Sequence, residues 1–290
     1  MRTSKGLIWF LIPGLLLYGI FFIFPTISAF GLGFTDWNGI NPNFNFVGVQ
    51  NYVDMVQDDI FKKAFGNNIK YMLFVVIFQT LFSLYFAILL FKNSKSNVFF
   101  RALFFVPTIV SSISVAFIWI FMYDASIGFL NKALTQIGLG FLAQQWLSDP
   151  KIAIFSIAIA QVWAHTGQVM IIFIAGLQSI PQSLYEVARI EGANKWQTFS
   201  KVTWPLLAPS ATIVVAYTTL QTFKSFDLIL AMTGGGPSYA TEILSMHIYH
   251  QAFQNFKFGY ASASAVLFML IIAAITFLQF RLLKSNRVTY

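Results

Sequence analysis

The stretch EVARIEGANKWQTFSKVTWP, residues 186–205, lies between two apolar segments that are each long enough to cross a lipid bilayer. These flanking segments cover about residues 152–178 and 206–230. The stretch itself gathers charged side chains in a chain of which only 10% of the residues are charged. A polar interruption of this length predicts a structured element at one membrane surface.

The composition excludes an ordinary soluble core. The 290 residues are 57% hydrophobic, with a mean hydropathy of +0.70 and 34 Phe. We predict an all-α polytopic membrane protein, a single transmembrane domain over residues 1–290. The first segment is too long for the apolar region of a cleaved signal peptide, so we interpret it as a retained span. The six predicted spans are approximately 7–34, 71–91, 102–122, 152–178, 206–230 and 260–280.

The distribution of Lys and Arg predicts the orientation, because cytoplasmic loops are enriched in both. If both termini are inside, eleven basic residues lie in inner segments and five in outer segments. We therefore predict a multi-pass membrane protein with both termini cytoplasmic. The net charge of +8 reflects this topology and not nucleic-acid binding. The inner residues are Arg2, Lys5, Lys92, Lys95, Arg101, Arg189, Lys195, Lys201, Arg281, Lys284 and Arg287.

Several kinds of chemistry have no basis in the sequence. There is no cysteine, no GxxxxGK[ST] loop for nucleotide phosphates and no HExxH motif, so we predict no catalytic residue and no metal site in this chain. His247 and His250 have a spacing that fits one helix face, but such pairs are common. Proton coupling would require a carboxylate within the membrane, and Asp227, near the outer end of the fifth span, is the only candidate.

The outer segments contain local helix and turn signals. YVDMVQDDIFKKAF, within residues 35–68, has the spacing of one short helix. The segment 123–151 predicts a surface helix, and the segment 231–259 opens with TGGGPSYATE, which predicts a tight turn.

The stretch at 186–205 predicts two short helices around a glycine elbow. Pro181 suits the first turn of a helix that runs to Gly192. Asn194 resembles an N-cap, with Gln197 three residues later, and begins a second helix that we expect to end before Pro205.

Two interpretations of this elbow remain open. It is either an amphipathic element that rests on the inner leaflet or a docking element for a partner protein. The small residues favour docking, since they permit close approach of a partner backbone. Apolar residues share one face of each helix: Leu184, Val187 and Ala188 in the first, and Trp196, Phe199 and Val202 in the second.

The pattern E-V-A-x3-G-x9-V-x-W-P, from Glu186 to Pro205, resembles the EAA loop of ABC importer permeases, E-A-A-x3-G-x9-I-x-L-P. The departures are Val187, Val202 and Trp204. Most of the chain is similar to the carbohydrate branch of these permeases, typified by MalF and UgpA. The similar stretches are FVGVQNYVDMV (46–56), GFLNKAL (128–134), AGLQSIPQSLYEVARIEGA (175–193), TFKSFDLILAMTGGGPSYATEIL (222–244) and FGYASASAV (258–266).

The resemblance implies a type I ABC importer transmembrane domain in the bacterial inner (cytoplasmic) membrane, with defined partners. These are a second, MalG-like permease, two ATPase subunits that bind ATP and Mg²⁺, and an extracytoplasmic solute-binding protein. The chain itself would bind no cofactor, and a sugar would pass between the two permeases. The EAA loop would form a coupling helix in a cleft of an ATPase subunit. Its motif positions here are Glu186, Val187, Ala188, Gly192 and Pro205.

Polar residues on the fourth and fifth predicted spans are candidates for the substrate pathway, which in this family lies near the middle of these two helices. The alternative is hydrogen bonding between neighbouring helices. The candidates are Gln161, His165 and Gln168 on the fourth span, and Thr218, Gln221, Thr222 and Ser225 on the fifth.

The outer turn has two compatible interpretations: a tight structural turn and a contact for the binding protein. Its residues are Gly234, Gly235, Gly236 and Pro237.

Three other functions compete with a sugar permease. The same machine could carry a glycerol-phosphate-type solute, although the spans contain no basic cluster. A stand-alone secondary carrier predicts intramembrane charge pairs and no coupling loop. A membrane enzyme predicts a convergent catalytic set that the sequence lacks.

Overall fold

The computed structural model describes residues 9–283, and the regular elements in that range are helices. Five of them are long and apolar enough to cross a membrane, and a sixth span results if the bent pair α6 and α7 is counted as one. This confirms the predicted all-α membrane fold. The described residues form two compact units: residues 9–62 with 244–271, and residues 63–243 with 272–283.

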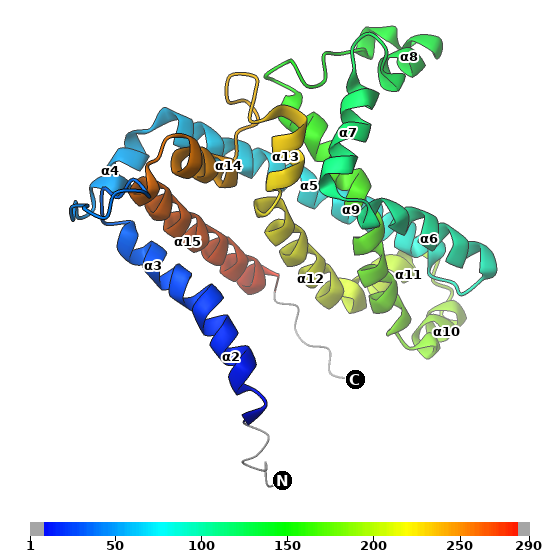
Figure 1. Ribbon diagram of the computed structural model, residues 1–290. Coiled ribbons are helices and arrows are strands. Elements are labelled where there is room, and N and C mark those ends of the chain that lie inside the picture. Colours follow the sequence, from blue (N-terminus) through cyan, green and yellow to red (C-terminus); the bar gives the residue numbers. More distant parts are fainter. Residues whose placement is uncertain (1–8, 284–290) are drawn as a thin grey trace. The chain divides into compact units, whose positions relative to one another are not determined.

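The second unit is built around α9, on which α6, α7, α12 and α13 pack (Figure 1). In the most apolar 18-residue stretch of α9, 67% of the residues are buried within the chain. The elements of this unit, with α5 shared at its first residues, are α5 (Asp59–Leu90), α6 (Lys95–Ile109), α7 (Ser112–Tyr123), α8 (Phe129–Gln136), η2 (Gly140–Leu142), α9 (Ala153–Gln178), α10 (Gln182–Ile190), α11 (Lys195–Thr198), η3 (Phe199–Thr203), α12 (Trp204–Phe223) and α13 (Phe226–Thr233).

The core of this unit lies at the ends of α5, α9 and α12 that adjoin α10 and α11. Small residues let the helices approach closely. Close packing matters here because lipid tails are as apolar as the side chains, so hydrophobicity alone does not drive membrane helices together. A Cβ on Gly167 would lie 2.0 Å from the Phe104 carbonyl oxygen, so α6 and α9 touch at backbone distance. The buried cluster comprises Ala87, Leu90, Val169, Met170, Phe173, Ile174, Leu177, Ile180, Leu207, Ala211 and Val214.

The predicted third span, 102–122, is not one helix. The structure divides it into α6 and α7, which are bent by 98°. Pro107 lies in the last turn of α6 and lacks a donor N–H. Ser111 then caps α7, because its hydroxyl accepts a hydrogen bond from the Ser114 N–H at 3.2 Å.

The predicted helix end before Pro205 is wrong. Helix continues from α11 through η3 into α12, an unbroken run over Lys195–Phe223. Proline tolerates this position because η3 is a π-turn, in which the Trp204 N–H bonds to the Phe199 carbonyl five residues back. The fifth span ends earlier than predicted, since α12 stops at Phe223 and α13 begins at Phe226.

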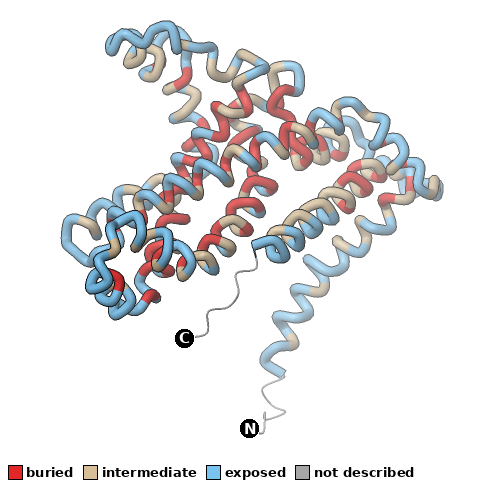
Figure 2. Tube along the Cα trace, turned by 180° about the vertical axis from the view of Figure 1, so that it is seen from behind, coloured by how far each residue is buried: buried red, intermediate tan, exposed pale blue. Residues whose placement is uncertain are grey.

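The first unit contains a helix that runs without a break over Ile12–Leu32, as α2 (Ile12–Tyr18), η1 (Gly19–Ile23) and α3 (Phe24–Leu32). None of its apolar window is buried, and Figure 2 shows the helix that follows the N label as mostly exposed. The other elements are α4 (Gln50–Gln57), α14 (Leu244–Tyr249), η4 (His250–Gln254) and α15 (Phe258–Leu282), the last ending in the second unit.

The start of α15 is held close to the segment after α3. A Cβ on Gly259 would lie 1.9 Å from the Thr35 carbonyl oxygen, and the Gly259 N–H donates to the Trp37 carbonyl at 2.8 Å. The amide of buried Asn51 donates to the carbonyls of Gly33 and Thr35, at 2.9 and 2.8 Å. These contacts fix α4 and α15 on the same short segment.

Candidate functional site

The elbow after α9 is set by local backbone chemistry. Gly192 has a φ of +74°, a conformation that favours glycine. Its N–H donates to the Arg189 carbonyl at 3.1 Å, and the Ala193 N–H donates to the Ala188 carbonyl at 2.9 Å. This pair of bonds is a Schellman motif, which satisfies the last carbonyls of α10.

The second helix of the elbow begins with the predicted cap. The Gln197 N–H donates to Asn194 Oδ1 at 2.9 Å, and the Asn194 N–H donates to Gln197 Oε1 at 2.8 Å. Both bonds of a capping box are therefore present. The turn between α10 and α11 is thus defined at both helix ends.

The elbow presents apolar side chains to its surroundings. Val187 is 54% exposed, Ile190 86% and Trp196 72%. Glu186 and Gly192 are also exposed, and a Cβ on Gly192 would meet no atom within 4 Å. Exposed apolar groups with polar neighbours fit contact with a partner protein or with the inner leaflet.

Ala188 does not share the exposed face of Val187. It is buried, and α10 packs on η3, where the Thr203 hydroxyl donates to Tyr185 Oη at 3.3 Å. The small size of Ala188 therefore serves packing within this chain. Pro205 lies in the first turn of α12 and is exposed.

The predicted pathway residues divide by burial. Gln161 and Ser225 are buried and joined, since the Ser225 hydroxyl donates to Gln161 Oε1 at 3.3 Å. The same hydroxyl lies 2.9 Å from Tyr71 Oη. Thr218 and Thr222 are also fully buried. These four predicted residues take part in packing within the chain.

The remaining three, His165, Gln168 and Gln221, are half-buried. His165 Nδ1 lies 3.2 Å from the Gln161 carbonyl on its own helix. Gln221 Oε1 accepts from the Gln79 amide at 3.1 Å. These three side chains are therefore the more accessible members of the predicted set.

The glycine turn after α13 is stabilised by its own hydrogen bonds. Gly234 and Gly235 have φ values of +58° and +89°. The Thr241 hydroxyl donates to the Gly236 carbonyl at 2.7 Å, and Lys63 Nζ donates to the Ser238 carbonyl at 2.5 Å. The tight-turn interpretation therefore holds, while exposed Gly234 and half-buried Gly236 and Pro237 leave part of the loop accessible.

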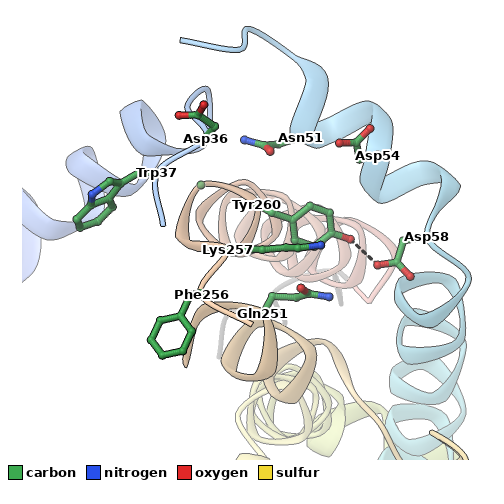
Figure 3. Close-up of a pocket in the computed structure, with 10 residues that line it drawn as sticks. Asp36, Trp37, Asn51, Asp54, Asp58, Gln251, Phe256, Lys257 and Tyr260 are labelled. Carbon is green, nitrogen blue, oxygen red and sulfur yellow. Dashed lines mark hydrogen bonds between the residues drawn. The ribbon is translucent and has the colours of Figure 1, made fainter. Parts of the chain in front are cut away.

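The first unit contains a polar cavity of about 440 Å³ (Figure 3). Asp58 connects two helices at this cavity, α5 and α15. One carboxylate oxygen accepts from the backbone N–H of Ile60 at 2.8 Å and so caps α5, and the other accepts from Tyr260 Oη at 2.9 Å. His247 is buried, with Nε2 3.6 Å from Asp58 Oδ2. The predicted single helix over YVDMVQDDIFKKAF is divided at Asp58 for this reason.

The surroundings of Asp58 and His247 shift the pKa of both groups. Burial raises the pKa of Asp58, but hydrogen bonds from Tyr260, Phe61 and Ile60 outweigh it, so that the pKa lies below its ordinary value. Burial lowers the pKa of His247, against the Asp58 carboxylate, which raises it. His247 is therefore neutral at pH 7, and its contact with Asp58 is not an ion pair there. The described residues hold no group of three His, Cys, Asp or Glu that could bind a metal.

Sequence reasoning missed Tyr71, Gln79 and Asp58. Gln79 has a buried amide within an apolar run. A polar residue inside a membrane span indicates a contact with another helix or a cavity, so the sequence did contain a signal for Gln79. Asp58 gave only the weaker signal of an Asp next to a helix start.

Residues 79–288 match the family model described as binding-protein-dependent transport system inner membrane component. A probable ABC transporter permease of Pyrococcus horikoshii is 37% identical over 283 residues, covering 96% of this chain and 97% of that protein. The multiple sugar-binding transport system permease MsmF of Streptococcus mutans is 34% identical, covering 96% and 95%.

A solved structure shares the fold. It is that of a bacterial ABC transporter involved in the import of the acidic polysaccharide alginate, with a TM-score of 0.83 and 21% identity, covering 100% of this chain and 98% of the matched chain.

Proposed function

The chain belongs to the family of binding-protein-dependent transport system inner membrane components, and on that premise we propose that it forms half of the translocation pathway for a sugar or oligosaccharide. It is a permease subunit of an ABC importer, a transporter subunit and not an enzyme. The likeness to a permease named for sugar transport supports the substrate class. The half-buried amides of Gln168 and Gln221 suit sugar hydroxyls.

The observation that carries the proposal is the exposed elbow. α10 and α11 project Val187, Ile190 and Trp196 outward while both helix ends are internally capped. An element that is rigid and apolar on its outer face suits a cleft in an ATPase subunit. The elbow is then the coupling helix, and Glu186 supplies an acceptor at its edge.

The proposed assembly has four further subunits. A second, MalG-like permease completes the pathway, two ATPase subunits carry ATP and Mg²⁺, and a solute-binding protein docks outside. The loop with Gly234 and Pro237 is the proposed outer contact. The whole chain acts as one transmembrane domain, and the elbow and both termini face the cytoplasm. Residues 1–8 and 284–290, with Arg2, Lys5, Lys284 and Arg287, lie outside the described residues.

Reconstitution of the complex tests this function. The chain is purified from its own host, and its co-purifying ATPase and second permease are identified. ATPase activity is then measured in nanodiscs with the binding protein and a panel of mono- and oligosaccharides. We expect stimulation by one class of glycan. A chain that purifies alone, or an ATPase that responds only to a non-carbohydrate solute, would contradict the proposal.

A further inference from the structure

We propose that a cavity behind the elbow binds the headgroup of an anionic phospholipid of the inner leaflet. The inference rests on the proposed orientation, in which the elbow is cytoplasmic. The cavity has a volume of about 850 Å³ and lies wholly in the second unit. It is formed by the ends of α5 and α9 together with α10, α11 and η3.

The cavity combines apolar walls with a basic rim. Its apolar walls provide a surface for the upper part of an acyl chain. Its basic residues come from three separate segments: Lys92 from the connection after α5, Arg189 from α10 and Lys195 from α11. The principal apolar residues are Ile88, Phe91, Leu177, Ile180 and Phe199.

The three cations have no competing carboxylate in the cavity. Glu186 and Glu191 belong to the same elbow but do not line the cavity. Within residues 9–283, Lys92, Arg189 and Lys195 form no salt bridge with a carboxylate, so their charges are not neutralised there. Positive charge that has gathered without a partner fits an anionic ligand.

Lys92 is held in place by its neighbour on α6. The Arg101 guanidinium donates to the Lys92 carbonyl at 3.0 Å and, through Nε, to the Leu90 carbonyl at 2.7 Å. Arg101 thereby caps α5 and leaves the Lys92 side chain on the cavity rim. The site thus has a fixed backbone on one side and the elbow on the other.

The location favours a lipid over free phosphate. The cavity opens where two membrane-spanning helices end, α5 at Leu90 and α9 at Gln178, which is the depth of lipid headgroups. Basic pockets between membrane helices on the cytoplasmic side bind anionic headgroups.

The test compares lipid retention by the whole complex. Wild type, Lys92→Gln and the double variant Lys92→Gln plus Lys195→Gln are assembled in nanodiscs of phosphatidylcholine and phosphatidylglycerol, extracted in mild detergent and examined by native mass spectrometry. The control is Lys132→Gln plus Lys151→Gln, which removes the same charge from exposed residues of the segment 123–151. We expect the wild type and the control to retain phosphatidylglycerol, and the double variant to bind it about 30-fold more weakly, or about 2 kcal/mol, at about 1 kcal/mol per basic residue.

Two results would overturn the site: equal retention by all four proteins, or displacement of the lipid by inorganic phosphate alone. The proposed function fails separately, if the ATPase does not co-purify with the wild type. Equal lipid retention in a complex that still couples ATPase activity to a glycan would remove the lipid site and leave the function intact.

Discussion

Gly192 shows how one residue can combine a backbone requirement with a contact surface. Its positive φ forms the elbow, and the space around its Cα is open within this chain. We expect Gly192→Asp to preserve folding and membrane insertion, because Asp tolerates this backbone conformation. The added carboxylate would enter an apolar interface without a partner, so binding-protein-stimulated ATPase activity should fall to the unstimulated rate.

The matched control is Gly138→Asp. Gly138 also has a positive φ, +81°, with no atom within 4 Å of a Cβ, but it follows α8 in a predicted outer loop. Stimulated ATPase activity of both variants in nanodiscs would be compared with wild type. Coupling that survives in Gly192→Asp would refute the role of the elbow.

His247 predicts a pH dependence of stability. Its pKa in the folded chain lies below the ordinary value of 6.5, so the unfolded chain takes up this proton first as the pH falls. The stability that comes from neutral, buried His247 is therefore present above pH 6.5 and is lost as the pH drops below it. Asp58, whose pKa is also lowered, loses its contribution only below its ordinary value of 3.8.

Thermal unfolding in detergent at pH 7.5 and 5.5 measures this effect. We expect the wild-type Tm to fall at pH 5.5, and the fall to shrink in His247→Gln. His250→Gln removes a histidine whose charge also lowers the pKa of His247, but it should retain the larger part of the fall because burial of His247 is the main cause. An identical pH response in wild type and His247→Gln would show that the histidine is not responsible.

Residues whose partners are near in sequence could be predicted, and those with distant partners could not. Asn194 and Gln197 form the expected cap because a capping box needs only four consecutive positions. Asp58 and Tyr260 are 202 residues apart, and Gln79 and Gln221 are 142 apart. No local pattern encodes such pairs, so Asp58 could not be assigned from the sequence.

At the scale of helices, close approach of α6 and α9 depends on Gly167. An alanine Cβ there would overlap the Phe104 carbonyl, which is backbone and cannot rotate away. We expect Gly167→Ala to destabilise the chain by about 1–3 kcal/mol. Thermal unfolding of the purified protein checks this value.

Gly66→Ala is the control for helix propensity. Gly66 lies in α5 with no atom within 4 Å of a Cβ, so alanine should be neutral or stabilising by up to about 1 kcal/mol. An equal effect of the two substitutions would show that the α6–α9 contact adapts at no cost.

Helix existence could be predicted better than helix ends. Apolar length identifies each span, because the bilayer sets a minimum. The break at Val110 and Ser111 was missed, since both flanks are apolar and the pattern is the same for a straight and a bent span. The continuation through Pro205 was missed because a proline normally ends a helical pattern, and the π-turn that accommodates it has no sequence signature.

For the whole molecule, orientation is the property that the charge pattern predicts and that labelling can measure. The chain contains no cysteine, so single cysteines can be introduced without a background. We expect Lys132→Cys to react with an impermeant maleimide in intact spheroplasts, and Lys92→Cys to react only after the membrane is opened. If Lys92→Cys reacted in intact spheroplasts and Lys132→Cys only after the membrane is opened, the topology would be the opposite of the predicted one and the elbow would lie outside.

The unbroken helix from Lys195 to Phe223 has a mechanical consequence. Its 29 residues span roughly 40 Å, from the elbow past the level of Thr218 and Gln221. A flexible linker would absorb a displacement of the elbow, whereas a continuous rod tilts as one body. We therefore expect a displacement of the elbow to be transmitted to the far end of the helix, and any bend along it to lie at the π-turn Phe199–Thr203 or at Pro209 inside α12.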